Sequence, residues 1–348
     1  MKKLFKVKIN YYFDLLLFLF LAVFPMFSTK FRIEQMSRYL CYVILIFSLD
    51  LLWGYAGTLS LGHSVLFGLG GYIYALSYSL KDGQVPTFMK NAGVNEVPGF
   101  MNVLSNQTAG VILAIVIPAV FAFLLGLFLF SSKVGGMFFA VITFALVTLA
   151  NLFLNNQSAF TGGANGITKI GRFVIGGKKL TISENYYFIL VAMVLTYLFC
   201  RWLTKSKFGK VVIATSENDQ RVKFLGYKTA LFKAFLYAIS GMLAGLAGVL
   251  FVPVSGIIAP TDVTGTLSTI LVIALAVGGK GCLTGGALGI ILIEWAQSML
   301  SESFSNVWQL ILGLLVIFIV FFVPEGFMGK VLGWQEKNLM KRKEAKHG

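Results

Sequence analysis

The amino-acid sequence predicts an all-α protein, a polytopic transmembrane helical bundle of about ten spans. Of its 348 residues, 57% are hydrophobic and only 12% are charged, and the mean hydropathy is +0.82. Soluble domains carry about 25% charged residues, so this composition excludes an ordinary soluble domain. A span requires roughly 20 apolar residues, and ten spans fit within this length.

The expected spans follow from the lengths of the apolar runs and from helix breakers, because periodicity does not separate faces in uniformly apolar segments. They are residues 11–27, 38–56, 60–80, 109–130, 135–155, 186–203, 233–252, 265–279, 283–301 and 306–323. Some of them are expected to be short or broken. The basic start of the chain resembles a signal peptide, but no small-residue cleavage site follows it, so the first span is expected to be retained.

The distribution of positive charge predicts the orientation, since Lys and Arg accumulate on cytoplasmic loops. With both termini cytoplasmic, 20 of the 29 Lys and Arg residues lie on the cytoplasmic side. The basic loop at 169–179, placed outside, fits this topology least. We expect residues 1–330 to form one transmembrane domain in a bacterial cytoplasmic (inner) membrane. Residues 331–348 are expected to form a basic cytoplasmic tail that contacts anionic membrane lipid.

The longest polar interruption in the second half of the chain is residues 204–232, which lies between two apolar segments. It combines helix-forming residues with a basic-acidic-basic charge pattern, and a glycine lies near each end, Gly209 and Gly226. On the positively charged side of the membrane, such a segment is expected to fold into a short block that binds a soluble partner.

A second informative stretch is residues 53–80, where glycines and polar residues lie at membrane depth. Thr58, Ser60, Gly62 and His63 belong to it. Irregular backbone at this depth is tolerated only where it is buried in protein or lines a watery cavity. The stretch therefore predicts a discontinuous helix beside a translocation path; the alternative is close helix packing with satisfied hydroxyl groups. No carboxylate lies at helical spacing from His63, which favours a hydrogen-bonded structural histidine over a proton relay.

Three further residues are candidates for a translocation path. Gly163 and Asn165 belong to a run of turn residues at 161–168, which predicts a tight loop at an outer mouth. Glu294 lies within an apolar segment, where a carboxylate costs about 2.5–3.5 kcal/mol and therefore faces the protein interior or a partner. Asp14 and Asp50 also lie in apolar segments. We found no matching intramembrane Lys or Arg, which disfavours a proton-conducting chain.

The remaining motifs argue against chemistry on this chain. Three distant cysteines lie in or beside apolar segments and are expected to pack as small core residues. The nucleotide-binding motif G-x4-G-K-[ST] is missing from the sequence. We therefore expect no catalytic residue, no metal and no cofactor, and any ATP is hydrolysed on another chain. Glycines around 241–248 and 278–289 are typical of close helix contacts.

A family resemblance rests on residues spread over most of the chain, from about residue 38 to about residue 328. They are Gly54-Tyr55, Gly57, Leu59-Ser60-Leu61-Gly62-His63, Phe67-Gly68-Leu69-Gly70, Phe208-Gly209-Lys210, Ala214, Glu217-Asn218-Asp219, Gly226-Tyr227 and Ala244-Gly245-Leu246-Ala247-Gly248. In these residues the chain resembles the second permease subunit of branched-chain amino-acid ABC importers.

A second set of residues is more similar to the permease of the urea ABC importer within this family. They are Gly70-Gly71-Tyr72, Gly162-Gly163-Ala164-Asn165-Gly166-Ile167-Thr168, Val252-Pro253, Gly256-Ile257-Ile258, Pro260, Ser298, Leu300-Ser301-Glu302, Phe304 and Trp308. The resemblance thus implies urea as the transported solute, and a branched-chain amino acid or related amide as the alternative.

The resemblance also implies the partners: a second homologous permease in a heterodimer, two cytoplasmic ATPase subunits and an external solute-binding protein. It implies that the block at 204–232 forms a coupling helix on an ATPase. The residues carried over to this role are Gly209, Ala214, Glu217, Asn218, Asp219 and Gly226. A secondary transporter or channel, and an integral-membrane enzyme, were the other classes considered.

Overall fold

The computed structural model describes residues 11–81, 83–94, 96–132, 134, 136–303 and 313–314. Three predictions lie outside this range: the basic N-terminal residues, the last span at 306–323 apart from residues 313–314, and the tail at 331–348. Phe304 and Trp308, which contributed to the likeness with the urea permease, also lie outside it.

Helices dominate the described part of the chain. Their order is α1 (Tyr11–Phe27), α2 (Lys30–Asp50), the π-helical turn η1 (Leu51–Tyr55), α3 (His63–Leu80), α4 (Thr87–Asn91), η2 (Gly99–Ser105), α5 (Gln107–Ser131), α6 (Met137–Asn156), α7 (Ser158–Thr161), η3 (Gly163–Asn165), β1 (Val174–Ile175), β2 (Lys178–Lys179), α8 (Ile182–Lys205), α9 (Lys207–Glu217), α10 (Asp219–Phe224), α11 (Thr229–Ser255), η4 (Pro260–Asp262), α12 (Gly265–Gly278) and α13 (Leu283–Ser303). β1 and β2 form a small antiparallel hairpin.

Seven helical segments of the described chain are long and apolar enough to cross a membrane. They are Lys30–Tyr55, Gln107–Ser131, Met137–Asn156, Ile182–Lys205, Thr229–Ser255, Pro260–Gly278 and Leu283–Ser301. The apolar helix α1 has 17 residues, and α3 is not among the seven. A polytopic helical protein is thus confirmed, while the count of ten spans and the side of the termini stay predictions.

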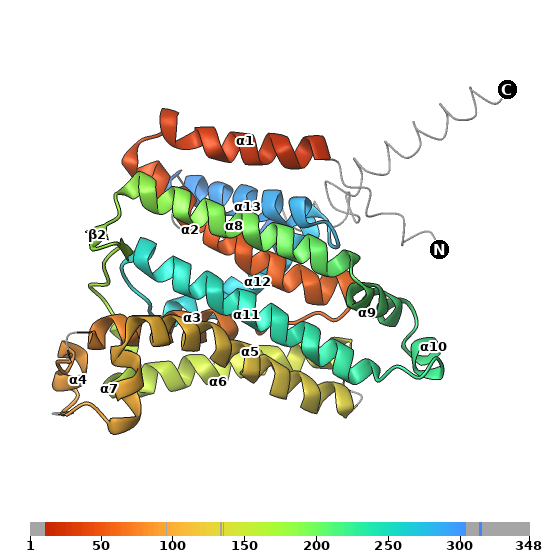
Figure 1. The fold of residues 1–348 in the computed structure, drawn as a ribbon, viewed down its shortest axis with the longest axis horizontal. Helices are drawn as coiled ribbons and strands as arrows, with labels where there is room; N and C mark the ends of the chain where they lie inside the picture. The colour runs from red at the N-terminus through yellow and green to blue at the C-terminus, as the bar shows by residue number, and fades with distance from the viewer. Residues whose placement is uncertain are drawn as a thin grey trace.

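Figure 1 shows how the polar connections are divided between the two ends of the bundle. The long helices run roughly along one direction. Helices α9 and α10 lie at one end, and α4, α7 and the β2 hairpin lie at the opposite end (Figure 1). The block at 204–232 is therefore separated from the two other long connections, as the predicted topology requires.

The core is built on glycines of α11, which let neighbouring backbones come close. A Cβ atom at Gly241 would meet the carbonyl oxygen of Pro118 in α5, and one at Gly248 would meet that of Phe67 in α3. Gly70 of α3 similarly faces the carbonyl oxygen of Gly245. The prediction that these glycines mark close helix contacts is confirmed, because no side chain fits between such backbones.

Close backbone contact at glycines also joins α12 to α13. A Cβ atom at Gly278 would meet the carbonyl oxygen of Gly285, and one at Gly289 would meet that of Ala274. Gly279 and Gly281 both have positive φ in the turn between the two helices. This turn is thus a helix connection, as the sequence predicted.

Candidate functional site

The chain leaves the helical conformation between η1 and α3, within the glycine-rich stretch at 53–80. After η1 the residues 56–62 are not helical, Gly57 has a φ of +72°, and α3 begins only at His63. Thr58, Ser60 and His63 are all buried. The backbone is therefore irregular and buried here, between the predicted spans 38–56 and 60–80, and a discontinuous helix beside a translocation path stays a prediction. We refer to residues 56–62 as the break.

His63 belongs to a hydrogen-bond chain inside the protein. Its Nε2 atom lies 2.8 Å from the Oγ of Ser240, and that hydroxyl donates to the carbonyl oxygen of Ser48 at 2.7 Å. Since the Ser240 proton is committed to Ser48, His63 donates from Nε2 and is the Nε2–H tautomer. This is the arrangement of a structural histidine that ties α3 to α11 and α2.

The break itself is held by hydroxyl groups of other helices. The amide of Leu61 donates to Thr143 Oγ1 of α6 at 3.0 Å, and Ser268 of α12 donates to Ser64 Oγ at 2.8 Å. The missing Cβ of Gly62 would lie 3.1 Å from the Cβ of Thr143. These contacts attach the break and the start of α3 to α6 and α12, while the buried Nδ1 of His63 has no hydrogen-bond partner in the described chain. Lining of a translocation path remains a prediction for Thr58, Ser60, Gly62 and His63.

Gly163 and Asn165 lie in η3, away from the break. The Gly163 amide donates to Thr161 Oγ1 at 3.1 Å, while Asn165 is exposed. Ile167 and Ile258 exchange backbone hydrogen bonds of 2.8 and 3.1 Å, which closes the segment. The tight loop is therefore as predicted, but none of the hydrogen bonds seen in the described chain joins it to His63.

Glu294 lies in α13, also separate from the break. The hydroxyl of Tyr39 in α2 donates to the Glu294 backbone carbonyl at 3.1 Å. Nearby, Gln35 of α2 donates to Ser298 Oγ at 2.6 Å. The Glu294 backbone thus takes part in the α2–α13 contact, and a place for its side chain in a translocation path stays a prediction.

The block at 204–232 folds into α9 and α10, and its two glycines have backbone roles. The Ser206 hydroxyl accepts from the Gly209 amide at 3.1 Å and caps α9. A Cβ atom at Gly209 would meet the carbonyl oxygens of Leu203 and Thr204 at the end of α8. Gly226 has a φ of +86°, which L side chains rarely adopt. Both glycines therefore shape the turns that orient the block.

The acidic and amide residues of the block differ in whether they interact with other residues of the chain. Glu217 is exposed, as is Ala214, whereas Asn218 Oδ1 caps α10 by accepting from the Arg221 amide at 3.0 Å. Asp219 forms ion pairs with Lys223 at 2.5 Å and Lys233 at 3.1 Å. Asn218 and Asp219, both assigned to the coupling role from the sequence, are thus engaged within the chain, and of the two carboxylates Glu217 is the one with no ion pair in the described residues.

The environment of Asp219 holds it charged. Burial opposes ionisation, but hydrogen bonds from Lys223 and Lys233 outweigh it and hold the pKa of Asp219 below its usual value. Because Lys233 is in α11, this charge attaches α10 to the start of that helix.

Two apolar residues at the end of α10, Phe224 and the following Leu225, were missed in the sequence analysis. Phe224 is 89% exposed and Leu225 is 75% exposed. An adjacent apolar pair within a polar loop was the available signal, since large exposed side chains outside a membrane mark contact surfaces when they cluster.

The block touches the break directly. Helix α9 packs against η1, and the missing Cβ of Gly57 would lie 3.1 Å from the Cβ of Ser216 in α9. A displacement of α9 would therefore reach residues 56–62 through a single contact.

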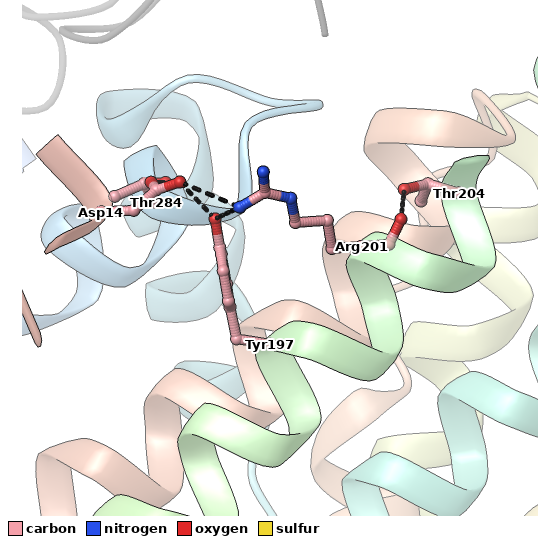
Figure 2. Close-up of polar contacts among 5 residues, drawn as sticks. All are labelled: Asp14, Tyr197, Arg201, Thr204 and Thr284. Atoms are coloured by element: carbon pink, nitrogen blue, oxygen red, sulfur yellow. Dashed lines mark hydrogen bonds and ion pairs between the residues drawn. The ribbon is translucent and has the colours of Figure 1, made fainter. Parts of the chain in front are cut away.

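A buried polar cluster joins α1, α8 and α13, and sequence reasoning overlooked its pairing (Figure 2). The carboxylate of Asp14 in α1 accepts from the hydroxyl of Tyr197 at 2.6 Å and from Thr284 of α13. It also pairs with Arg201 of α8 at 3.4 Å. The statement that no intramembrane Lys or Arg matches the buried acids was therefore wrong for Asp14. Arg201 was assigned to the end of a span, and packing of α1 onto α8 brings it to the acid.

Asp50 marks a second joint at this end. Its Oδ1 accepts from the Gly281 amide in the α12–α13 turn at 2.7 Å. A Cβ atom at Gly54 would meet both groups, and Lys280 lies over the ring of Trp53 at 5.5 Å. Asp50 thus connects η1 to the start of α13.

Comparison with known proteins decides the family. The family of branched-chain amino acid transport system permease components matches residues 33–321. The chain belongs to this family. As a permease component of this kind it is an integral protein of the cytoplasmic (inner) membrane and is not itself an enzyme.

Individual relatives agree. The chain is 22% identical to the high-affinity branched-chain amino acid transport system permease protein LivM of Salmonella typhimurium, over 88% of this chain and 72% of the relative. It is 27% identical to the probable LivM of Methanocaldococcus jannaschii, over 82% and 90%. It is 29% identical to the autoinducer 2 import system permease protein LsrC of Escherichia coli O9:H4, over 42% and 44%. No solved structure matches this chain.

Proposed function

We propose that this permease is one half of an ATP-driven importer in which α9 and α10 form the coupling surface for an ATPase subunit. The contact between Ser216 and Gly57 carries this proposal, because it joins an exposed block at one end of the bundle to the break in the membrane. ATP binding on the partner would move the block, and the block would shift residues 56–62. A central path would then open alternately to the two sides of the membrane.

The complete importer would contain a second, homologous permease, two ATPase subunits and an external solute-binding protein. Family membership supports this composition in general. Glu217 is the carboxylate offered to the ATPase, and Gly209, Ala214 and Gly226 set the shape of the surface, whereas Asn218 and Asp219 act by fixing α10.

The solute we propose is urea. The glycine-rich loop Gly162–Thr168 and the residues around Ser298 support this choice, because they resemble the urea branch of the family. Urea is uncharged and requires only hydroxyl, amide and carbonyl partners. Branched-chain amino acids are the second candidate. The name of the relative LivM of Salmonella typhimurium, a branched-chain amino acid transport system permease protein, favours them.

Uptake of labelled urea at low micromolar concentration, with and without excess unlabelled leucine, distinguishes the two solutes. Loss of urea uptake on deletion of the gene, insensitive to leucine, supports urea. Unchanged urea uptake with lost leucine uptake contradicts it and transfers the chain to amino-acid import, leaving the coupling proposal intact.

The coupling role has its own test, Glu217→Ala in the assembled complex. We expect uptake to fall while the subunits still assemble and hydrolyse ATP. The Glu217 side chain is exposed, so its removal should not destabilise the fold. The matched control is Glu96→Ala, an exposed glutamate in the connection at the other end of the bundle. Equal uptake in the two variants would remove Glu217 from the coupling surface.

A further inference from the structure

An apolar groove runs from the surface block into the membrane-spanning part of α11, and it is separate from the break and from the Asp14 cluster. Its volume is about 660 Å³. It is lined by Leu203, Phe208, Gly226, Tyr227, Lys228, Leu231, Phe232, Phe235 and Ile239. Of the residues proposed for transport or coupling, it shares Gly226, which shapes the turn before α11.

The depth of the groove follows from the geometry of α11. This helix has 27 residues, so it is about 40 Å long at 1.5 Å per residue. A hydrocarbon core of about 30 Å leaves roughly 5 Å of helix outside at each end. Phe235 lies about 9 Å and Ile239 about 15 Å from the first residue, Thr229. Both therefore lie within hydrocarbon, where a soluble protein does not reach.

The other end of the groove lies at the membrane surface. Tyr227 and Lys228 precede α11, and Tyr227 is 44% exposed. The ring of Phe232 stacks on Phe208 at 5.5 Å and meets the edge of Tyr227 at 5.8 Å, which makes a rigid aromatic wall. Tyrosine and lysine at this level are typical of the headgroup region.

Charge determines what the surface end attracts. Lys228 is exposed, and none of the ion pairs in the described chain uses its ammonium group. Lys205 and Lys207, next to the lining residue Phe208, are exposed as well. Asp219 does not balance them, because it already pairs with Lys223 and Lys233.

We propose that this groove binds an anionic phospholipid, with the headgroup phosphate at Lys228 and one acyl chain along Leu231, Phe235 and Ile239. A surface cation joined to an apolar channel at membrane depth fits an amphiphile, and basic pockets between membrane helices take anionic headgroups. The site does not depend on which solute is transported; only the assignment to the cytoplasmic leaflet rests on the proposed topology.

Native mass spectrometry of the full chain in mild detergent tests the site, with phosphatidylglycerol or phosphatidylcholine of matched chains added back. We expect phosphatidylglycerol to be retained over phosphatidylcholine, and Lys228→Gln to lower its occupancy about fivefold, the effect of one lysine near a lipid surface. Lys280→Gln, which removes a lysine from the α12–α13 turn, is the matched control and should change nothing. Ile239→Trp fills the deep end and should lower retention of both lipids.

Three outcomes would overturn the proposal. The first is equal retention of the two lipids by the wild-type chain, and the second is equal loss in Lys228→Gln and Lys280→Gln. The third is release of the lipid when the ATPase or the second permease is added, because the groove is then a protein interface. Retention of phosphatidylglycerol by the assembled complex supports the site, and an unchanged melting temperature of each variant excludes misfolding.

Discussion

Two regions of this permease are held together by different physics. In the trio of α3, α5 and α11, backbones meet at glycines and the contacts are non-directional. At the end of the bundle that carries α9 and α10, helices are joined by hydrogen bonds and ion pairs: Asp14 with Tyr197, Arg201 and Thr284, Asp50 with the Gly281 amide, and Asp219 with Lys233.

The difference indicates where the protein can move. Close-packed backbones tolerate no displacement without clashes, because interiors are as dense as organic crystals. A hydrogen bond or ion pair at a helix end can be exchanged for another as the helices shift. We therefore expect the glycine-packed trio to move as one body and the polar end to be the place where coupling rearranges contacts.

The largest expected effect is a loss of stability when the packing of α3, α5 and α11 is disrupted. In Gly70→Val the new side chain would meet the carbonyl oxygen and Cα of Gly245, neither of which can move aside. We expect a loss of more than about 3 kcal/mol and little folded protein, since overpacking commonly costs 1–3 kcal/mol even where side chains can adjust. Thermal unfolding of the purified chain measures it. The control, Gly99→Val, has open space around it and should be close to neutral.

The second prediction concerns the Asp14 cluster. Arg201→Ala leaves a carboxylate of 9% side-chain exposure without its cation, and removal of one partner of a buried pair costs about 3 kcal/mol. The double variant Asp14→Asn, Arg201→Ala should unfold at a higher temperature than Arg201→Ala alone. If the double variant is the less stable of the two, the pairing does not hold α1 in place.

The third prediction separates two properties of Asp50. In the described chain its Oδ2 has no hydrogen-bond partner, while Oδ1 accepts from Gly281. Asp50→Asn retains an acceptor and should fold normally, whereas Asp50→Leu leaves the Gly281 amide unsatisfied and should cost about 1–3 kcal/mol. Equal melting temperatures for the two variants would show that this hydrogen bond contributes nothing.

The smallest expected effect is the pH dependence of the Asp219 pairs. The pKa of Asp219 is lowered in the folded protein, so its contribution is present above the unfolded pKa of about 4 and is lost as the pH falls through the folded pKa. Its side chain is 34% exposed, so solvent screening limits the effect to less than about 1 kcal/mol. The difference in melting temperature between wild type and Asp219→Asn should shrink as the pH is lowered towards 3. A constant difference would contradict the pairing.

Much of the fold could be predicted from apolar run lengths and glycine positions. The helix interruption after Trp53 was expected because glycine and hydroxyl residues gather there, and the tight loop at 161–168 because of its turn residues. The predicted span at 38–56 begins earlier in the structure, at Lys30, because a charged helical turn can extend beyond hydrocarbon. The predicted span at 60–80 begins later, at His63, because residues 60–62 belong to the non-helical break.

The candidate site was predicted less completely. Glu217 and Ala214 are exposed as a coupling surface requires, but the partners of Asp219 and Asn218 lie within the chain. The pairing of Asp14 with Arg201 joins residues far apart in sequence. No local pattern encodes such a pairing, because it depends on how α1 packs against α8.

The sequence by itself determined that this chain is a helical membrane protein, where its glycines force close contact, and which segment is polar enough to leave the membrane. These properties are local, since each depends on the solvation of a stretch of residues or on the volume of one side chain. Tertiary structure alone decided that α9 touches the break at Gly57, that the buried acids Asp14 and Asp50 find different partners, and that Lys228 lies at the mouth of an apolar groove. Such contacts arise only when helices distant in sequence are packed, and a single sequence carries no direct record of that packing.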